Sequence, residues 1–262
     1  MQKYILKFLK EKAAFIRKKT IEIHLSYPET RIASSLSCVE ILVTLYYGKI
    51  LNILEDKIVI SKGHGAISLY PILVNCGYLK LENNNLENTV LKFGSIPDIN
   101  LPTISLINGS LGNGLGQACG IALALKKKNQ KGKVFVLLGD GELYEGSVWE
   151  SFMFAGHHRL DNLIVIIDNN KICMLDFCEK VINLKPLDKK LENFGFEVKI
   201  VNGHNIQRIY NVLRLFKKSN IKKPKILIAN TVKGKGVYKL ENDPLCHIKS
   251  LSKEDVKDLN FT

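Results

Sequence analysis

Two polar turns, Gly139-Asp140-Gly141 and Asp168-Asn169-Asn170, each follow directly on a short run of apolar residues. Asp140 offers a carboxylate and Asn170 an amide oxygen, and Mg²⁺ takes one or two such ligands together with phosphate oxygens and water. The glycines beside Asp140 allow the backbone to approach a diphosphate, and a helix expected to begin near Leu143 would point its positive end there. Each turn alone is typical of ordinary turn chemistry, but together they predict a Mg²⁺-diphosphate site.

The elements that position these turns are predicted from the hydrophobic pattern. Residues 134–138, 163–167 and 226–229 are wholly apolar runs, and residues 114–128, 143–158 and 205–217 have helical periodicity. Wholly apolar strands that alternate with helices are typical of a parallel sheet covered on both faces. We therefore predict a doubly wound α/β fold in which the two turns lie together beyond the carboxyl ends of adjacent strands, where ligands of such folds bind.

The first part of the chain is predicted to be mainly helical. Residues 3–25 and 37–47 are expected to form helices, the second with Ser37 as its N-cap, followed by a strand over 57–61 and a helix over 66–76. There is no internal repeat, low-complexity stretch or Pro/Gly-rich linker. Residues 1–262 are therefore expected to form a single domain, with an N-terminal helical segment over about residues 1–50.

The net charge of +13 comes mostly from lysines that are spread along the chain. The densest groups, at 126–128 and 217–223, lie at the ends of predicted helices, where cations suit the helix dipole and the solvent. No recognisable nucleic-acid module surrounds them, so a basic nucleic-acid binder is the least favoured class.

The cysteines and the N-terminus indicate the compartment. The six cysteines form no C-x-x-C pair and lie mostly inside apolar stretches, which indicates reduced, buried thiols. The lysine-containing N-terminus is not a secretory signal, and no apolar run approaches the ~20 residues needed to span a bilayer. We expect a cytoplasmic protein with no membrane partner.

Several segments resemble the transketolase family, in the family's order and over nearly the whole chain. The thiamine-diphosphate signature of the family is similar to the segment from Gly139 to Gly146 together with residues 168–172. The other matching segments are Ser61-Lys62-Gly63-His64-Gly65, Asn108-Gly109-Ser110-Leu111-Gly112-Asn113-Gly114, and Thr231-Val232-Lys233-Gly234-Lys235-Gly236 followed by Glu241-Asn242-Asp243 and His247.

The resemblance implies thiamine diphosphate and Mg²⁺ as cofactors. Asp140 and Asn170 would bind Mg²⁺ through their side chains, and Ile172 through its backbone carbonyl. The residues implied to contact the rest of the cofactor are Gly139, Gly141 and His247 at the diphosphate, with Gly109 and Leu111 on the far side. The match at His247 is weaker, because its flank lacks the family's usual Trp-His-Gly.

Two further residues are implied to take part in the chemistry. His64 would lie near the thiazolium and the reacting carbonyl, a role that suits a side chain able to donate or accept a proton near neutral pH. Glu145 would belong to an acidic network that links the two cofactor sites of a dimer. The remaining histidines, His157, His158 and His204, are expected to be structural.

The resemblance also implies a second chain as partner. The full-length transketolases continue for two more domains, one of which supplies the glutamate that activates the cofactor, whereas this sequence ends at Thr262. We therefore expect the N-terminal subunit of a split transketolase-like enzyme. It would transfer a two-carbon ketol or acyl-anion unit to an aldehyde or sugar acceptor, and be active only with a C-terminal subunit in a heterotetramer.

Two departures from the family concern the substrate. Arg31 stands where transketolases carry a substrate-facing histidine, and Ile96 precedes Pro97 where the family often has a histidine. An arginine offers a permanent bidentate cation for a carboxylate or phosphate. We therefore hypothesise an acidic or modified sugar, or a 2-oxo acid decarboxylated on the cofactor, as the substrate. The alternatives are an ion-paired surface role for Arg31 and, for the whole chain, a non-catalytic regulatory homologue.

Overall fold

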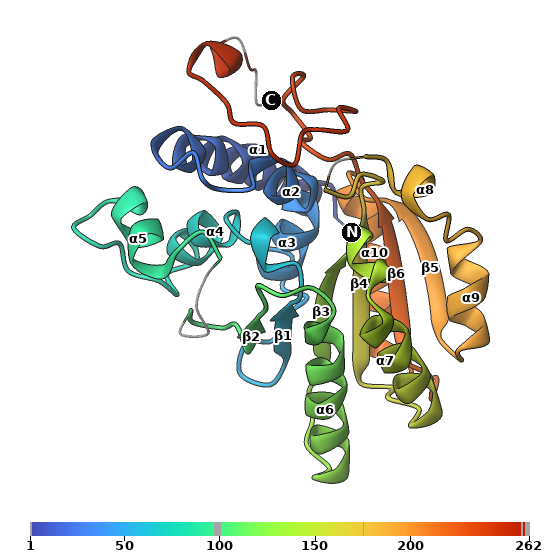
Figure 1. Ribbon diagram of the computed structural model, residues 1–262. Coiled ribbons are helices and arrows are strands. Elements are labelled where there is room, and N and C mark those ends of the chain that lie inside the picture. The colour runs from blue at the N-terminus through green and yellow to red at the C-terminus, as the bar shows by residue number, and fades with distance from the viewer. Residues whose placement is uncertain (1, 97–100, 175, 258, 260–262) are drawn as a thin grey trace.

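The computed structural model describes residues 2–96, 101–174, 176–257 and 259, so the expectation for Pro97 lies outside the described residues. At its centre is a parallel sheet in the order β2-β1-β3-β4-β6-β5 (Figure 1). The doubly wound α/β prediction is confirmed. The strands are β1 (Lys57–Ile60), β2 (Leu106–Ile107), β3 (Val134–Gly139), β4 (Leu163–Asn169), β5 (Glu197–Asn202) and β6 (Lys225–Asn230).

Helices cover both faces of the sheet, as Figure 1 shows. One face packs against α1 (Lys3–Ser26), α3 (Val39–Tyr46), α4 (Leu69–Asn75) and α10 (Ile206–Lys218). The other packs against α6 (Asn113–Lys127), α7 (Gly146–His157) and α9 (Leu187–Asn193). The shorter helices are α2 (Ile32–Ser37), α5 (Leu86–Phe93) and α8 (Cys178–Val181), with 3₁₀ turns η1 (Gly63–Gly65), η2 (Gly141–Tyr144) and η3 (Glu254–Val256).

The central strands β3, β4 and β6 each contain a wholly apolar run because both of their faces are buried. In β3, Phe135 and Leu137 belong to the core on the α1 side, whereas Val134, Val136 and Leu138 belong to the core on the α6 side. Successive side chains of a strand point to opposite faces, so a strand covered by helices on both sides needs an apolar residue at every position. This is why β3, β4 and β6 could be predicted from composition alone.

A third, smaller core joins the C-terminal segment to the first helices. Residues after β6 return across α2, as the red segment of Figure 1 shows, and bury Val237, Leu240 and Cys246 against Ile32 and Leu36. This segment therefore lies beside the same carboxyl edge of the sheet as α2.

Three predicted helix starts differ from the structure, one of them because the helix expected from residue 66 begins at Leu69, after the 3₁₀ turn η1. Ser37 is the last residue of α2 and not an N-cap, because Cys38 breaks the helix there and the Ser37 hydroxyl donates to Ser34 O and to the Asp168 carboxylate. The helix expected near Leu143 begins at Gly146, since residues 141–144 form the 3₁₀ turn η2 first. Its N-terminal dipole is therefore further from Asp140 than we expected.

Among the described residues, no helix has the length and apolarity needed to cross a membrane.

Candidate functional site

The two polar turns lie side by side at the carboxyl edge of the sheet. Strands β3 and β4 are parallel neighbours that pair Gly139 with Asp168, and the backbone N–H of Asp140 donates to Asp168 O at 3.3 Å. Asp140 and Asn170 therefore leave adjacent strands at the same level, as the sequence predicted.

The carboxylate of Asp140 is held by backbone and not by a cation. Its Oδ1 accepts from Gly141 N at 2.9 Å and its Oδ2 from the N–H of Lys171, while Asn170 Oδ1 accepts from Ile172 N at 3.2 Å. Asp140 is only 5% exposed. Burial, and next the charge of Asp168, raises the pKa of the Asp140 carboxyl to about 6.

A buried lysine faces the same place. Lys233, 3% exposed, donates from Nζ to Ile172 O at 2.8 Å and to Cys173 O at 2.7 Å. Burial lowers the pKa of its ammonium group, although the charge of Asp140 acts in the opposite direction. In the described part of the chain, neither Lys233 nor Asp140 belongs to an ion pair. The sequence placed Lys233 in a family segment but assigned it no role.

These groups line one cavity of about 590 Å³. Its walls come from the ends of β4 and β6, from η2 and from the segment around α8. The site residues among its lining are Asp140, Asn170, Lys171, Ile172 and Lys233.

The donor set of the cavity fits Mg²⁺ and a diphosphate. A carboxylate, an amide oxygen and a backbone carbonyl are all hard oxygen ligands, which Mg²⁺ prefers to nitrogen or sulfur. Within the described residues no group of three or more His, Cys, Asp and Glu could hold a metal, and the expected set contains only one such residue. A buried carboxylate and a buried ammonium that both lack an ion-pair partner are suited to a bound cation and a bound anion, respectively.

His64, His247 and Arg31 form a second group. The rings of His64 and His247 have centroids 5.3 Å apart, and Ser34 Oγ lies 3.4 Å from His247 Nδ1. Arg31 is exposed at the start of α2, and its charge is one of those that lower the pKa of His247. The structure thus brings His247, which the sequence placed at the diphosphate, together with His64 and Arg31, which the sequence placed near the reacting carbonyl and the substrate.

Both histidines of this group are held neutral. Burial, and next the charge of Lys62, lowers the pKa of His64 to about 2. Burial, and next the charge of Lys233, lowers the pKa of His247 to about 4. The role implied for His64, that of donating or accepting a proton near the reacting carbonyl, stays a prediction, and burial favours the uncharged ring of His64. It is a neutral imidazole that can donate one hydrogen bond and accept another.

A second buried carboxylate, which the sequence reading missed, joins three loops. Glu142 accepts from Gly112 N at 2.9 Å, from Gly139 N at 3.3 Å and from the hydroxyl of Ser61. Burial raises its pKa. Glu142 thus ties the loop of residues 108–114 to the ends of β1 and β3.

The remaining predicted residues lie around that loop. Glu145 is exposed. Gly112, which has φ +88, packs against Glu145 so closely that a Cβ added at Gly112 would lie 2.7 Å from Glu145 Cβ. Gly109 is exposed beside Ile96, and Leu111 is half-buried. None of Gly109, Leu111 and Glu145 lines the cavity.

A fully buried ion pair lies at the carboxyl edge of the sheet, beneath the candidate site. Lys62 and Asp168, which are 1% and 0% exposed, form an ion pair. The Asp168 carboxylate also accepts hydrogen bonds from the hydroxyls of Ser37 and Thr231. Burial alone would raise the pKa of Asp168, but Lys62 holds it below its ordinary value. Because both charges are matched here, the pair supports the site without offering a ligand group.

Comparisons with known proteins show the family of the chain and agree with its fold. The family described as transketolase, thiamine diphosphate binding domain, matches residues 50–261. The chain is 37% identical to one of the subunits of the apulose-4-phosphate transketolase of Actinobacillus succinogenes, over 95% of this chain and 96% of that protein. It is 34% identical to one of the subunits of the 6-deoxy-6-sulfo-D-fructose transketolase of a Clostridium species, over 94% and 92%.

Among solved structures, the transketolase of Campylobacter jejuni superposes with a TM-score of 0.84 at 28% identity. The match covers 100% of this chain but 44% of that one. Fold and site therefore define a thiamine-diphosphate-binding domain. The chain belongs to the transketolase family of thiamine-diphosphate-dependent transferases and corresponds to the N-terminal half of such an enzyme.

Proposed function

We propose that this chain holds the diphosphate and Mg²⁺ of thiamine diphosphate as the N-terminal subunit of a split transketolase-like enzyme. The observation that carries the proposal is a cavity lined by both the buried Asp140 carboxylate and the buried Lys233 ammonium. Among the described residues, these two groups form no ion pair with each other or with any other side chain. Mg²⁺ would balance the carboxylate, and the diphosphate would balance the ammonium.

Each residue of the site then has a defined task. Asp140 and Asn170 would bind the metal through their side chains, and Ile172 through its carbonyl, whose second lone pair remains for Lys233. The backbone at Gly139 and Gly141 would lie against the diphosphate. When bound, the cofactor supplies the nucleophilic carbon for transfer of a two-carbon unit, and the protein supplies position and electrostatics.

The two neutral histidines would hold the reacting carbonyl. With their pKa values lowered to about 2 and about 4, His64 and His247 carry no charge at neutral pH. They would act as hydrogen-bond donors and acceptors to the substrate, and neither would deliver a proton from an imidazolium.

The rest of the enzyme would come from a C-terminal subunit, in a heterotetramer with two copies of each chain. Two relatives that this chain matches over nearly their whole length are named as subunits. The exposed residues Gly109 and Glu145, and the half-buried Leu111, would face that partner. We further propose that residues 1–262 form one cofactor-binding domain of a cytoplasmic enzyme, consistent with the free cysteines.

The substrate would be a sugar that carries an anionic group. The two relatives are named for a phosphorylated and a sulfonated sugar. In this chain an exposed guanidinium, Arg31, stands beside the His64–His247 pair. A guanidinium binds phosphate or sulfonate oxygens in a bidentate manner.

Calorimetric titration of thiamine diphosphate, with and without Mg²⁺, tests the cofactor site. It should use protein purified from its own host, so that any partner chain is retained. We expect metal-dependent binding that is lost in Asp140→Ala and kept in Asp161→Ala. The control removes an acid paired with Lys126 and Lys222 just before β4, at the opposite edge of the sheet. No binding by the wild-type complex would reject the proposal and favour a regulatory homologue.

Arg31→His tests the substrate proposal in the assembled enzyme. We expect KM for a phosphorylated or sulfonated sugar to rise about tenfold or more, because one charge-assisted bidentate contact is worth about 1.5–3 kcal/mol. Arg208→His, which changes an exposed arginine on α10, is the matched control. An unchanged KM ratio between charged and uncharged sugars would reject the role of Arg31.

A further inference from the structure

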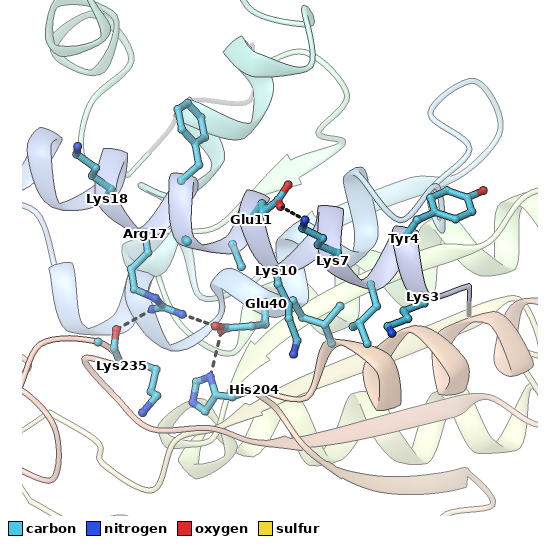
Figure 2. Close-up of a pocket in the computed structure, with 16 residues that line it drawn as sticks. Lys3, Tyr4, Lys7, Lys10, Glu11, Arg17, Lys18, Glu40, His204 and Lys235 are labelled. Atoms are coloured by element: carbon cyan, nitrogen blue, oxygen red, sulfur yellow. Dashed lines mark hydrogen bonds and ion pairs between the residues drawn. The ribbon is translucent and has the colours of Figure 1, made fainter. Parts of the chain in front are cut away.

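Three polar side chains form a buried network at the floor of a groove along α1 (Figure 2). Arg17 comes from α1, Glu40 from α3 and His204 from the loop before α10. Arg17 Nη2 donates to Glu40 Oε1, and His204 Nδ1 lies 3.0 Å from Glu40 Oε2. Arg17 is 7% and Glu40 8% exposed. None of the three touches the cofactor cavity, so the cofactor-binding site does not explain them.

The charges of the network are balanced and its histidine tautomer is defined. Burial alone would raise the pKa of Glu40, but Arg17 and then His204 hold it below its ordinary value, so Glu40 is ionised. The Nε2 atom of His204 accepts from the backbone N–H of Val232 at 2.8 Å. In the neutral ring the other nitrogen, Nδ1, then carries the hydrogen and donates it to Glu40.

Two outward contacts of the network reach the segment 232–236, and a third, from Arg17 Nη1 to Leu36 O at 2.9 Å, reaches α2. His204 accepts from Val232 N, and Arg17 Nη1 donates to Lys235 O at 2.7 Å, as the dashed line in Figure 2 marks. Gly236 packs directly on Arg17, since a Cβ there would meet Arg17 Cδ at 2.6 Å. The network thus contacts the backbone of this segment both before and after Lys233.

Lys233 is the residue of this segment that points the other way, into the cofactor cavity. Its ammonium group donates to the carbonyls of Ile172 and Cys173. A lysine side chain has a flexible four-carbon stem and loses much conformational entropy when its ammonium group is held in one place. Its reach to two carbonyls therefore depends on a backbone that is itself held in place.

We propose that His204 is a positioning residue: with Arg17 and Glu40 it fixes the backbone of Val232–Lys235 so that Lys233 reaches the carbonyls of Ile172 and Cys173. Its effect on cofactor affinity rests on the function proposed above, whereas its effect on the segment does not. Other contacts, such as Gly234 N to Ala33 O at 2.9 Å, remain when His204 is changed, so the variants should fold.

The variants are His204→Ala, His204→Gln and a matched control, His24→Ala. Gln can donate to Glu40 and accept from Val232 N, and so restores part of the arrangement. His24 is fully buried, whereas His204 is partly buried. Like His204, it accepts from a backbone N–H (Leu251 N, 3.0 Å) and contacts a side chain (Thr30 Oγ1, 2.7 Å). It differs in that, among the described residues, its hydrogen bonds reach Thr30, Ser250 and Leu251 and not the segment 232–236.

Hydrogen–deuterium exchange of the full chain, with its co-purified partner and without cofactor, is the first measurement. We expect the amides of 232–235 to exchange about tenfold faster or more in His204→Ala, with partial recovery in His204→Gln and no change in His24→Ala. Wild-type rates in His204→Ala, or an equal rise in His24→Ala, would overturn the proposal.

Titration of thiamine diphosphate with Mg²⁺ is the second measurement. We expect Kd to rise about tenfold to a hundredfold in His204→Ala, the range seen when the support of a metal ligand is removed. His204→Gln should lose less and His24→Ala nothing. An unchanged Kd beside faster exchange would refute the link to the cofactor. If the wild-type complex itself does not bind, the proposed function fails, while the exchange rates still decide the role of His204.

Discussion

The raised pKa of Asp140 predicts how the stability of the cofactor-free protein depends on pH. Its carboxyl has a pKa of about 6 in the folded chain against an ordinary value of 3.8. The native state therefore binds this proton more tightly than the unfolded state does. Stability is highest where the group is protonated in both states, falls as the pH rises from about 4 to about 6, and is level above about 7.

The size of the effect follows from the shift. At about 1.36 kcal/mol for each pKa unit, ionised Asp140 destabilises the cofactor-free protein by about 3 kcal/mol when fully developed, of which about 2 kcal/mol develops between pH 4 and pH 7.5. Asp140→Asn removes this dependence. It also replaces one oxygen that accepts from a backbone N–H, but that loss does not vary with pH.

The assay is urea unfolding followed by the fluorescence of the single tryptophan, Trp149, for the wild type and Asp140→Asn at a series of pH values. We expect the difference in free energy of unfolding, variant minus wild type, to rise by about 2 kcal/mol from pH 4 to pH 7.5. Mg²⁺ and thiamine diphosphate should abolish the rise, because a bound cation favours the ionised carboxylate. A difference that stays flat within about 0.5 kcal/mol without cofactor would refute the reasoning.

Two further changes test the support of the site. Lys62→Met should lower the free energy of unfolding, measured in urea, by about 3–5 kcal/mol, because it leaves Asp168 charged and unpaired in the core. The control Lys57→Met, at the start of β1, should lower it by less than about 0.5 kcal/mol. Gly112→Ala should destabilise by about 1–3 kcal/mol, because φ is +88 and the new Cβ would meet Glu145. Gly120→Ala, in a helix with nothing within 4 Å, should instead stabilise by up to about 1 kcal/mol. A drop in thermal midpoint for Gly120→Ala as large as that for Gly112→Ala would contradict this account of the loop.

The parts of the fold that could be predicted depend on periodicity. The wholly apolar runs of β3, β4 and β6 predict strands buried on both faces, and a polar residue directly after such a run is located at the carboxyl edge. Strand β5 could not be predicted in this way, since it lies at the edge of the sheet and exposes residues such as Ile200. Helix α2 was missed, and Ser37 was predicted as an N-cap, because residues 32–46 are buried throughout and leave no polar face to mark where a helix begins or ends.

The site residues that were missed are long polar side chains whose partners are remote in sequence. Lys233 meets carbonyls about sixty positions away, and Glu142 joins Ser61 to Gly112 and Gly139. In the sequence a lysine is more typical of a solvated surface, and nothing next to Lys233 indicates that it is buried. Asp140, by contrast, could be predicted because its neighbours alone, a strand before it and a glycine on each side, determine where it lies.

The buried charges at this edge of the sheet are satisfied in different ways: Glu142 lies outside the cavity lining and is satisfied by hydrogen bonds from Ser61, Gly112 and Gly139. Lys62 and Asp168, 1% and 0% exposed, are each matched by the other and by hydroxyls, so the pair needs no ligand. Asp140 and Lys233 are buried almost as completely, and burial shifts the pKa of each toward its neutral form. A protein under selection for stability alone would gain by pairing or replacing such groups. That both line one cavity and take part in no ion pair of the described structure supports the proposal that a cation and an anion bound together complete this site.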